Sequence, residues 1–129
     1  MTKGKKNSVL QWISKAEMDL VAAKRLMKED PLTVSEIIGF LCQQSIEKYL
    51  KAYLAFKNYD FRKTHDLEEL RDICAKFDKD FEHFDYFNLT EYAVEFRYSS
   101  DEFAPGQEEI EYFISLAEKT KNLIIEKVK

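Results

Sequence analysis

The stretch that decides the fold is TVSEIIGFLCQQSIEKYLKAYLAFKN, residues 33–58. Its apolar residues recur every three or four positions, which is the spacing of one face of a helix. This apolar face comprises Ile38, Cys42, Ile46, Tyr49, Tyr53 and Phe56. Thr33 followed three residues later by Glu36 is typical of a helix start, because each side chain can bond a backbone N–H near the other. The stretch therefore predicts one long helix with a buried face.

The same stretch carries a polar stripe opposite its apolar face. The stripe consists of Gln43, Gln44, Glu47, Lys48 and Lys51. One interpretation is a solvated helix face, in which Glu47 and Lys51 form a favourable pair one turn apart. The other is a ligand-binding face, because two glutamines stand beside lysines between the aromatic residues Phe40 and Tyr49. The stripe alone leaves both interpretations open.

Four further helices are predicted around this stretch. One begins at Ser8 and ends before Pro31, and one begins at Asp66, whose side chain suits a helix start. The other two cover residues 85–99 and 107–128. Only three glycines and two prolines occur in 129 residues, which favours long helices. We expect an all-α fold with five helices around an up-and-down four-helix bundle, forming a single domain over residues 1–129.

Composition excludes several classes of function. The formal net charge of -4 argues against a non-specific DNA-binding protein, which must neutralise phosphates with a basic surplus. The longest apolar run, IIGFLC, is too short to span a bilayer, and the basic N-terminus has no apolar run typical of a signal peptide. The two histidines and two cysteines do not come in close pairs, so we expect no metal site and no cofactor. Cys42 and Cys74 are expected to be buried free thiols in a cytoplasmic protein.

Arg97 stands in the predicted helix over 85–99, between Phe96 and Tyr98. It can form a structural ion pair with Asp101, or with a glutamate of a neighbouring helix such as Glu47. Alternatively, its planar guanidinium can hold a phosphate group through two hydrogen bonds, while Tyr98 stacks or donates its hydroxyl. Arg97 and Tyr98 are therefore candidate ligand-binding residues.

His65 is the second candidate, in the segment RKTHDLEEL. It can be a local structural residue beside the start of the helix at Asp66. Alternatively, it can donate a proton or bind a phosphate group, with Arg62 and Lys63 close in sequence. His83 is isolated in the sequence and is interpreted as structural.

Several segments together resemble a known family. FLCQQSIEKYLKAYLAF followed by KTHDLEEL is similar to the HEPN domain family (higher eukaryotes and prokaryotes nucleotide-binding). The matching residues are Phe40, Gln43, Gln44, Glu47, Lys48, Leu50, Lys51 and Ala52, then Thr64, His65, Asp66 and Leu67. Trp12, Ala16, Asp19, Leu20 and Ala23 near the N-terminus also match, as does the pair Arg97-Tyr98.

This resemblance implies a five-helix domain that is usually dimeric and is often encoded beside a minimal nucleotidyltransferase in toxin–antitoxin or related pairs. Many members are metal-independent ribonucleases in which a histidine follows an arginine at a short, fixed spacing. Here the corresponding positions after Arg97 hold Glu102, Phe103 and Ala104, so that histidine is missing. The sequence therefore resembles the Arg-Tyr branch, whose role is usually described as ligand binding or pairing with a nucleotidyltransferase.

We therefore expect a nucleotide- or phosphate-binding, or interaction, module that partners a nucleotidyltransferase. The high aromatic content of 14% also favours a homodimer, because some rings can cover an interface. The expected site residues are Arg97, Tyr98, Lys48, Lys51, Gln44, Glu47 and His65. Two alternatives are a metal-independent RNA endonuclease, using Arg97 with His65 or Glu102, and a purely structural dimer that holds its partner chain.

Overall fold

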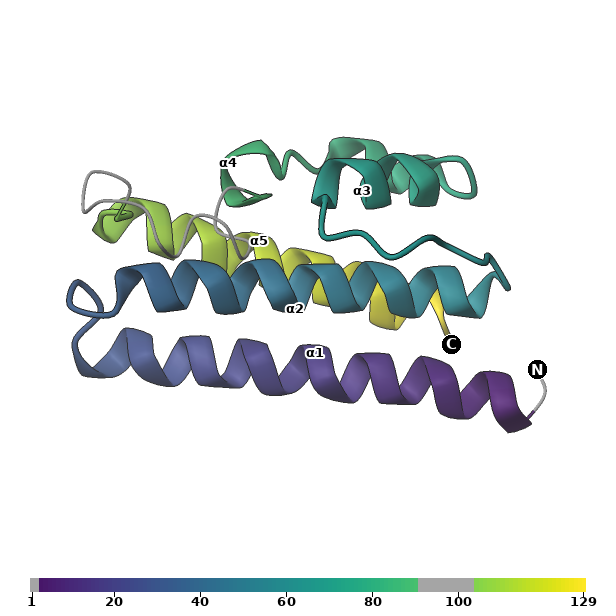
Figure 1. The fold of residues 1–129 in the computed structure, drawn as a ribbon, viewed down its shortest axis with the longest axis horizontal. Coiled ribbons are helices and arrows are strands. Elements are labelled where there is room, and N and C mark those ends of the chain that lie inside the picture. Colours follow the sequence, from purple (N-terminus) through teal and green to yellow (C-terminus); the bar gives the residue numbers. More distant parts are fainter. Residues whose placement is uncertain (1–2, 91–103) are drawn as a thin grey trace.

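The computed structural model describes residues 3–90 and 104–129, and every regular element in these ranges is helical (Figure 1). The elements are α1 (Lys3–Glu29), α2 (Ser35–Phe56), α3 (Leu67–Ala75), the 3-10 helix η1 (Lys79–His83), α4 (Phe87–Thr90) and α5 (Gln107–Lys127). The described ranges contain no strand, which confirms the expected all-α fold.

The helix count differs from the expected five. Within the described ranges, α1, α2, α3 and α5 each have nine or more residues. Of the helix expected over 85–99, the described residues contain the four-residue helix α4. Arg97 and Tyr98, which were expected in its later part, lie outside the described residues. The short helix η1 was not expected from the sequence.

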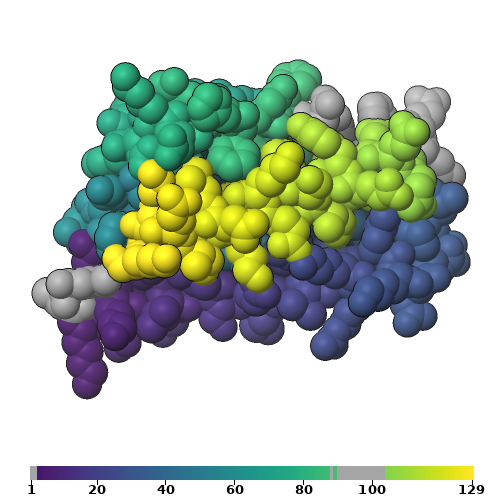
Figure 2. Space-filling view, turned by 180° about the vertical axis from the view of Figure 1, so that it is seen from behind, coloured from purple at the N-terminus to yellow at the C-terminus, as the bar shows by residue number. Residues whose placement is uncertain are grey.

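α2 is the central element of the structure (Figure 1). It runs antiparallel to α1, with α3 and α4 on its other side, and α5 lies behind it in the same direction as α2. The start of α1 and the ends of α2 and α5 gather at one end of the molecule. Figure 2, seen from behind, shows α5 lying across the back against α1. A helix covered by neighbours on several sides must bury more than one face, and this decides how the polar stripe of α2 is placed.

The core confirms the apolar face predicted for α2. Cys42, Ile46 and Tyr49 are fully buried, whereas Phe56 near the end of the helix is only partly buried. On α1 the buried positions include the small residues Ala16 and Ala23, which let the two backbones approach closely. Ser45 of α2 uses this approach, since its hydroxyl donates to the carbonyl oxygen of Ala16 at 2.8 Å.

Of the three helix starts predicted from capping side chains, two were wrong. α1 begins at Lys3 rather than Ser8, because the residues before Ser8 contain no proline and Lys5 and Lys6 favour helix enough to continue it through Gly4. The capping box of Thr33 and Glu36 does not form, since the Thr33 hydroxyl donates instead to Asp30 at 2.7 Å. The Asp66 start is confirmed, because its carboxylate accepts from the backbone N–H groups of Glu68 and Glu69.

The two cysteines, Cys42 and Cys74, are free and fully buried, as the sequence predicted. Burial raises the pKa of the Cys42 thiol to about 12, because an apolar environment disfavours the thiolate. Among the helices of the described residues, none has the length and apolar character needed to cross a membrane.

Candidate functional site

Three of the five polar-stripe residues of α2 are buried. Gln43, Glu47 and Lys51 are 0%, 4% and 5% exposed. They are covered by residues 57–66, called the strap here, which leave the end of α2 and run back along it towards α3 (Figure 1). The solvated-face interpretation is therefore wrong for these three side chains. Buried polar groups need partners, and the strap and α2 supply them to each other.

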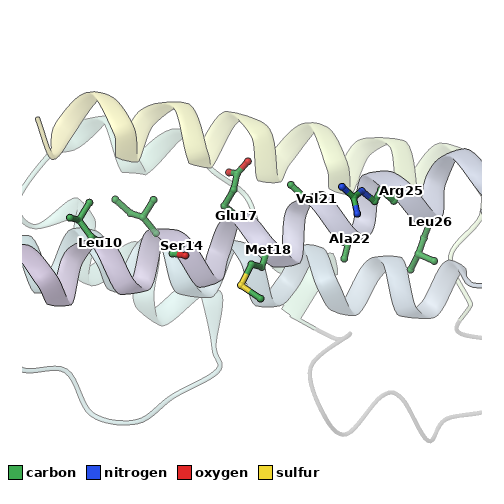
Figure 3. Close-up of a pocket in the computed structure, with 9 residues that line it drawn as sticks. Leu10, Ser14, Glu17, Met18, Val21, Ala22, Arg25 and Leu26 are labelled. Atoms are coloured by element: carbon green, nitrogen blue, oxygen red, sulfur yellow. The ribbon is translucent and has the colours of Figure 1, made fainter.

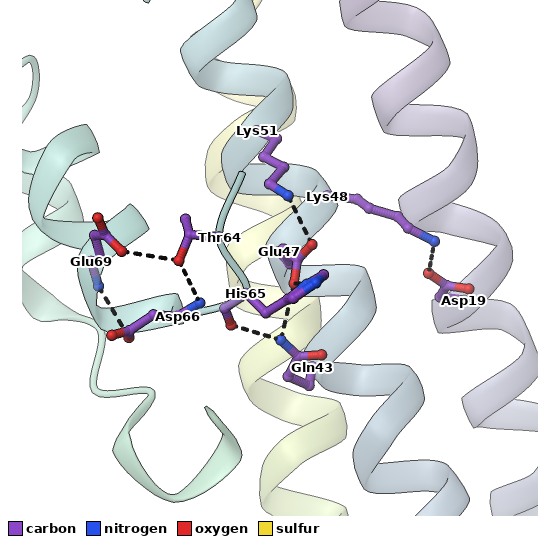
Figure 4. A network of polar contacts seen from close by, with 9 residues as sticks. All are labelled: Asp19, Gln43, Glu47, Lys48, Lys51, Thr64, His65, Asp66 and Glu69. Carbon is purple, nitrogen blue, oxygen red and sulfur yellow. Dashed lines mark hydrogen bonds and ion pairs between the residues drawn. The ribbon is translucent and has the colours of Figure 1, made fainter. Parts of the chain in front are cut away.

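Glu47 is the centre of the resulting polar network (Figure 4). Its Oε1 atom lies 2.9 Å from Nδ1 of His65 on the strap and accepts from Nε2 of Gln43 at 3.2 Å. Its Oε2 atom accepts from Nζ of Lys51 at 2.9 Å. Gln43 also donates to the backbone carbonyl of His65 at 3.1 Å. Two α2 residues, Gln43 and Glu47, thus hold one strap residue by both its backbone and its side chain.

Lys51 joins α1 to this network. Its ammonium group lies 5.6 Å from the ring centroid of Trp12 on α1 and 5.7 Å from that of Phe61 on the strap. The negative faces of aromatic rings attract a cation, and this attraction strengthens when water is excluded. The buried charge of Lys51 is therefore balanced by the Glu47 carboxylate and by two rings.

The other side of His65 is fixed by the start of α3. The Thr64 hydroxyl donates to the Glu69 carboxylate at 2.9 Å and accepts from the backbone N–H of Asp66 at 3.1 Å. Glu69 also accepts two hydrogen bonds from the guanidinium of Arg62. The backbone on both sides of His65 is thereby tied down, and the histidine side chain remains 49% exposed.

The structure brings together three of the expected site residues, Glu47, Lys51 and His65. Lys48 is directed elsewhere, since its ammonium lies 2.6 Å from Asp19 of α1. Gln44 is partly buried and, one helical turn before Lys48, shares its side of α2. Arg97 and Tyr98 lie outside the described residues. His83 is exposed at the end of η1.

Gln43, Trp12 and Phe61 were not among the site residues expected from the sequence. Gln43 could have been found, because Gln43, Glu47 and Lys51 follow each other at four-residue spacing along one line of the helix. Phe61 carried no signal in the sequence. Gln43 also has the network's unsatisfied atom, since its Oε1 is buried and has no hydrogen-bond partner among the described residues.

Chemically, the network presents one titratable ring at the surface with a buried carboxylate behind it. An imidazole held in this way can accept or donate a proton at its outer nitrogen. Among the described residues, no group of three or more histidine, cysteine, aspartate or glutamate side chains could hold a metal ion. The described part of the site is therefore suited to hydrogen bonding and proton transfer.

The helical fold, the strap and this network define an all-α protein whose two most distinctive sequence segments meet at one place. Residues 9–128 match the family model of the HEPN domain. The chain therefore belongs to the HEPN domain family. No curated protein and no solved structure matches it.

Proposed function

We propose that this HEPN domain is a nucleotide- or phosphate-ligand-binding or interaction module that partners a minimal nucleotidyltransferase in a toxin–antitoxin-like pair. Membership of the family supports a role related to nucleotides or RNA. The observation that carries the proposal is the meeting of the α2 stripe and the Thr64–Asp66 segment in one network, which leaves His65 half-exposed at the surface.

In this proposal the phosphate charge is met by Arg97, with Tyr98 beside it. The two lysines expected at the site are already engaged, Lys51 with Glu47 and Lys48 with Asp19. Recruiting either ammonium for a ligand would leave a carboxylate without its partner, at a cost that is greater for the buried pair. An arginine, which stays charged and can form two parallel hydrogen bonds, suits the phosphate better.

The proposed protein is a cytoplasmic homodimer. An open groove along the outer face of α1 supports the dimer, because it exposes Leu10 and Met18, which are 51% and 68% exposed (Figure 3). The proposal also includes the five-helix, up-and-down bundle.

The direct test is nucleotide binding. We expect AMP or ATP to bind the wild-type protein in isothermal titration calorimetry, and Arg97→Ala to weaken binding at least ten-fold, in line with the loss of a charge-assisted hydrogen-bond pair. Lys119→Ala, which removes an exposed cation from α5, away from the α1 groove, is the control and should bind as the wild type does. Equal affinity of wild type and Arg97→Ala would remove Arg97 from the site.

The partner is tested separately. We expect the product of the adjacent gene, if it is a nucleotidyltransferase, to co-purify with this chain when both are expressed together. A stable complex without any nucleotide binding would favour the purely structural alternative, in which the dimer only holds its partner.

RNA cleavage is the second candidate function. The half-exposed His65, backed by the Glu47 carboxylate, favours it because a histidine of this kind can act as an acid or base. Cleavage in excess EDTA that is lost in Arg97→Ala would support a metal-independent endonuclease. Intact RNA at high protein concentration would exclude that activity.

A further inference from the structure

We propose that Nε2 of His65 is a fixed hydrogen-bond acceptor for a hydroxyl group of the bound ligand. Glu47 is the positioning residue that fixes it. The ligand is taken to be a nucleotide with its ribose hydroxyls, and this identity rests on the proposed function. The assignment of the imidazole itself rests only on the geometry of the network.

The ring nitrogen of His65 that faces Glu47 carries the hydrogen. The Glu47 carboxylate lies 2.9 Å from the Lys51 ammonium, and an ionised carboxylate can only accept hydrogen bonds. The nitrogen facing it, Nδ1 of His65 at 2.9 Å, must therefore carry the hydrogen. A neutral imidazole has one N–H, so Nε2 is left with a lone pair.

The orientation of the His65 ring is fixed by its neighbours. Gln43 donates both to Glu47 and to the backbone carbonyl of His65, so the carboxylate and the strap are held in register. Thr64 and Asp66 fix the backbone on the far side through the first turn of α3. Turning the His65 ring would break its hydrogen bond to a nearly buried carboxylate, which makes the direction of Nε2 a fixed property of the fold.

The His65 side chain is accessible to a ligand. The His65 side chain is 49% exposed, and its Nε2 atom has no hydrogen-bond partner among the described residues. The charges behind it, Glu47 and Lys51, neutralise each other, and Arg62 is engaged by Glu69. A lone pair in this position takes a hydrogen from a donor. A hydroxyl group supplies one, whereas an unprotonated phosphate oxygen does not.

The ring assignment is tested by long-range ¹H–¹⁵N NMR of the histidine side chains at about pH 8.5, where an ordinary histidine is neutral. We expect His65 in the wild type to show the form with hydrogen on Nδ1. His83 is the internal control, because no hydrogen bond of its ring to another described residue fixes either nitrogen. A His65 ring that carries its hydrogen on Nε2, or that averages as His83 does, would overturn the inference.

Glu47→Gln tests whether Glu47 is responsible. A glutamine amide can either donate to Nδ1 or accept from it, so the hydrogen is no longer forced onto Nδ1 and we expect the form with hydrogen on Nε2 to become populated. Because this change leaves Lys51 buried without its carboxylate, the double variant Glu47→Gln with Lys51→Met is measured beside it, and circular dichroism verifies the helical content. Unchanged His65 signals in a folded variant would overturn the positioning role of Glu47.

The ligand assignment is tested with AMP and 2′,3′-dideoxy-AMP, which lacks both ribose hydroxyls. We expect the wild type to bind AMP roughly five- to ten-fold more tightly, the effect of one hydrogen bond. His65→Ala should bind both nucleotides equally, whereas His83→Ala should keep the preference. Equal binding of the two nucleotides by the wild type would overturn this ligand assignment but leave the proposed function intact. No binding of either would overturn the proposed function, and with it this ligand assignment, while leaving the NMR result in place.

Discussion

The ammonium group of Lys48 on α2 lies 2.6 Å from the Oδ2 atom of Asp19 on α1. The two residues are far apart in sequence, and each belongs to a segment that resembles the HEPN family. Their side chains are 23% and 19% exposed, so the pair is shielded from water on most sides. One function of these two family positions is therefore to fix α1 against α2, the helix that carries the site.

We expect this pair to contribute to stability. In a double-mutant cycle of Asp19→Asn and Lys48→Met, the coupling free energy should be about 1 kcal/mol, at the upper end for partly exposed pairs. Urea unfolding followed by circular dichroism measures it. The pair Lys24 and Glu118, whose side chains are 43% and 30% exposed, is the control and should couple more weakly. Strict additivity at Asp19 and Lys48 would show that the two charges do not interact in solution.

Glu17 should make the protein sensitive to acid. Its pKa is held below the ordinary value by hydrogen bonds from Lys121 and from the Tyr49 hydroxyl. A carboxylate with a lowered folded-state pKa contributes stability that is complete above its ordinary pKa and is lost as the pH falls through the folded value. Glu17→Gln should therefore lose less stability than the wild type between neutral pH and about pH 3.

The measurement is the free energy of unfolding of both proteins at the two pH values. The exposed Glu126 offers the control, and Glu126→Gln should follow the wild type. A Glu17→Gln variant with the wild-type pH dependence would mean that the Lys121 and Tyr49 contacts do not persist in solution.

Much of the fold could be predicted because its signals are local. The apolar spacing of α2 predicted Cys42, Ile46 and Tyr49 as core residues, and all three are buried. The side chain of Asp66 could cap a helix without any distant partner, and it does. Thr33 failed as a helix start because its hydroxyl bonds to Asp30 instead, a competition between two short-range partners that spacing alone does not decide.

The site was only partly predictable, because its burial depends on the strap. The spacing of Gln43, Glu47 and Lys51 describes a polar line on a helix whether that line meets water or another segment. The strap that covers it has no regular structure and left no periodic signal. The resemblance to a family placed His65 beside these residues in one motif, but the contact between His65 and Glu47 is tertiary and appears only in the fold.

Cys42 should be inert towards thiol reagents in the folded protein. It is fully buried, and its pKa is raised to about 12, so both access and thiolate formation are suppressed. At about pH 8, labelling with a disulfide reagent should proceed only as fast as the protein opens, and it should become rapid in denaturant. Ser115→Cys, which introduces a thiol at an exposed position of α5, is the control and should react at once. Immediate labelling of the wild type would contradict the burial of both native cysteines.

Lys51 should be the residue of the network least tolerant of loss. Lys51→Met removes the ammonium from a carboxylate that is only 5% exposed, and leaving a buried charge unpaired costs about 3–5 kcal/mol. That is a large share of the 5–15 kcal/mol by which domains are typically stable. Urea unfolding measures the loss, and the fluorescence of Trp12, the single tryptophan, reports on the ring beside Lys51.

The double variant Lys51→Met with Glu47→Gln separates the buried charge from the other roles of the two side chains. A glutamine at position 47 is neutral and can still form a hydrogen bond with His65, so we expect the double variant to be more stable than Lys51→Met alone. This order of stability follows only if Glu47 is ionised and shielded from water by the strap. A double variant as unstable as Lys51→Met, or less stable, would show that Lys51 acts mainly by packing between Trp12 and Phe61, with its charge of little consequence.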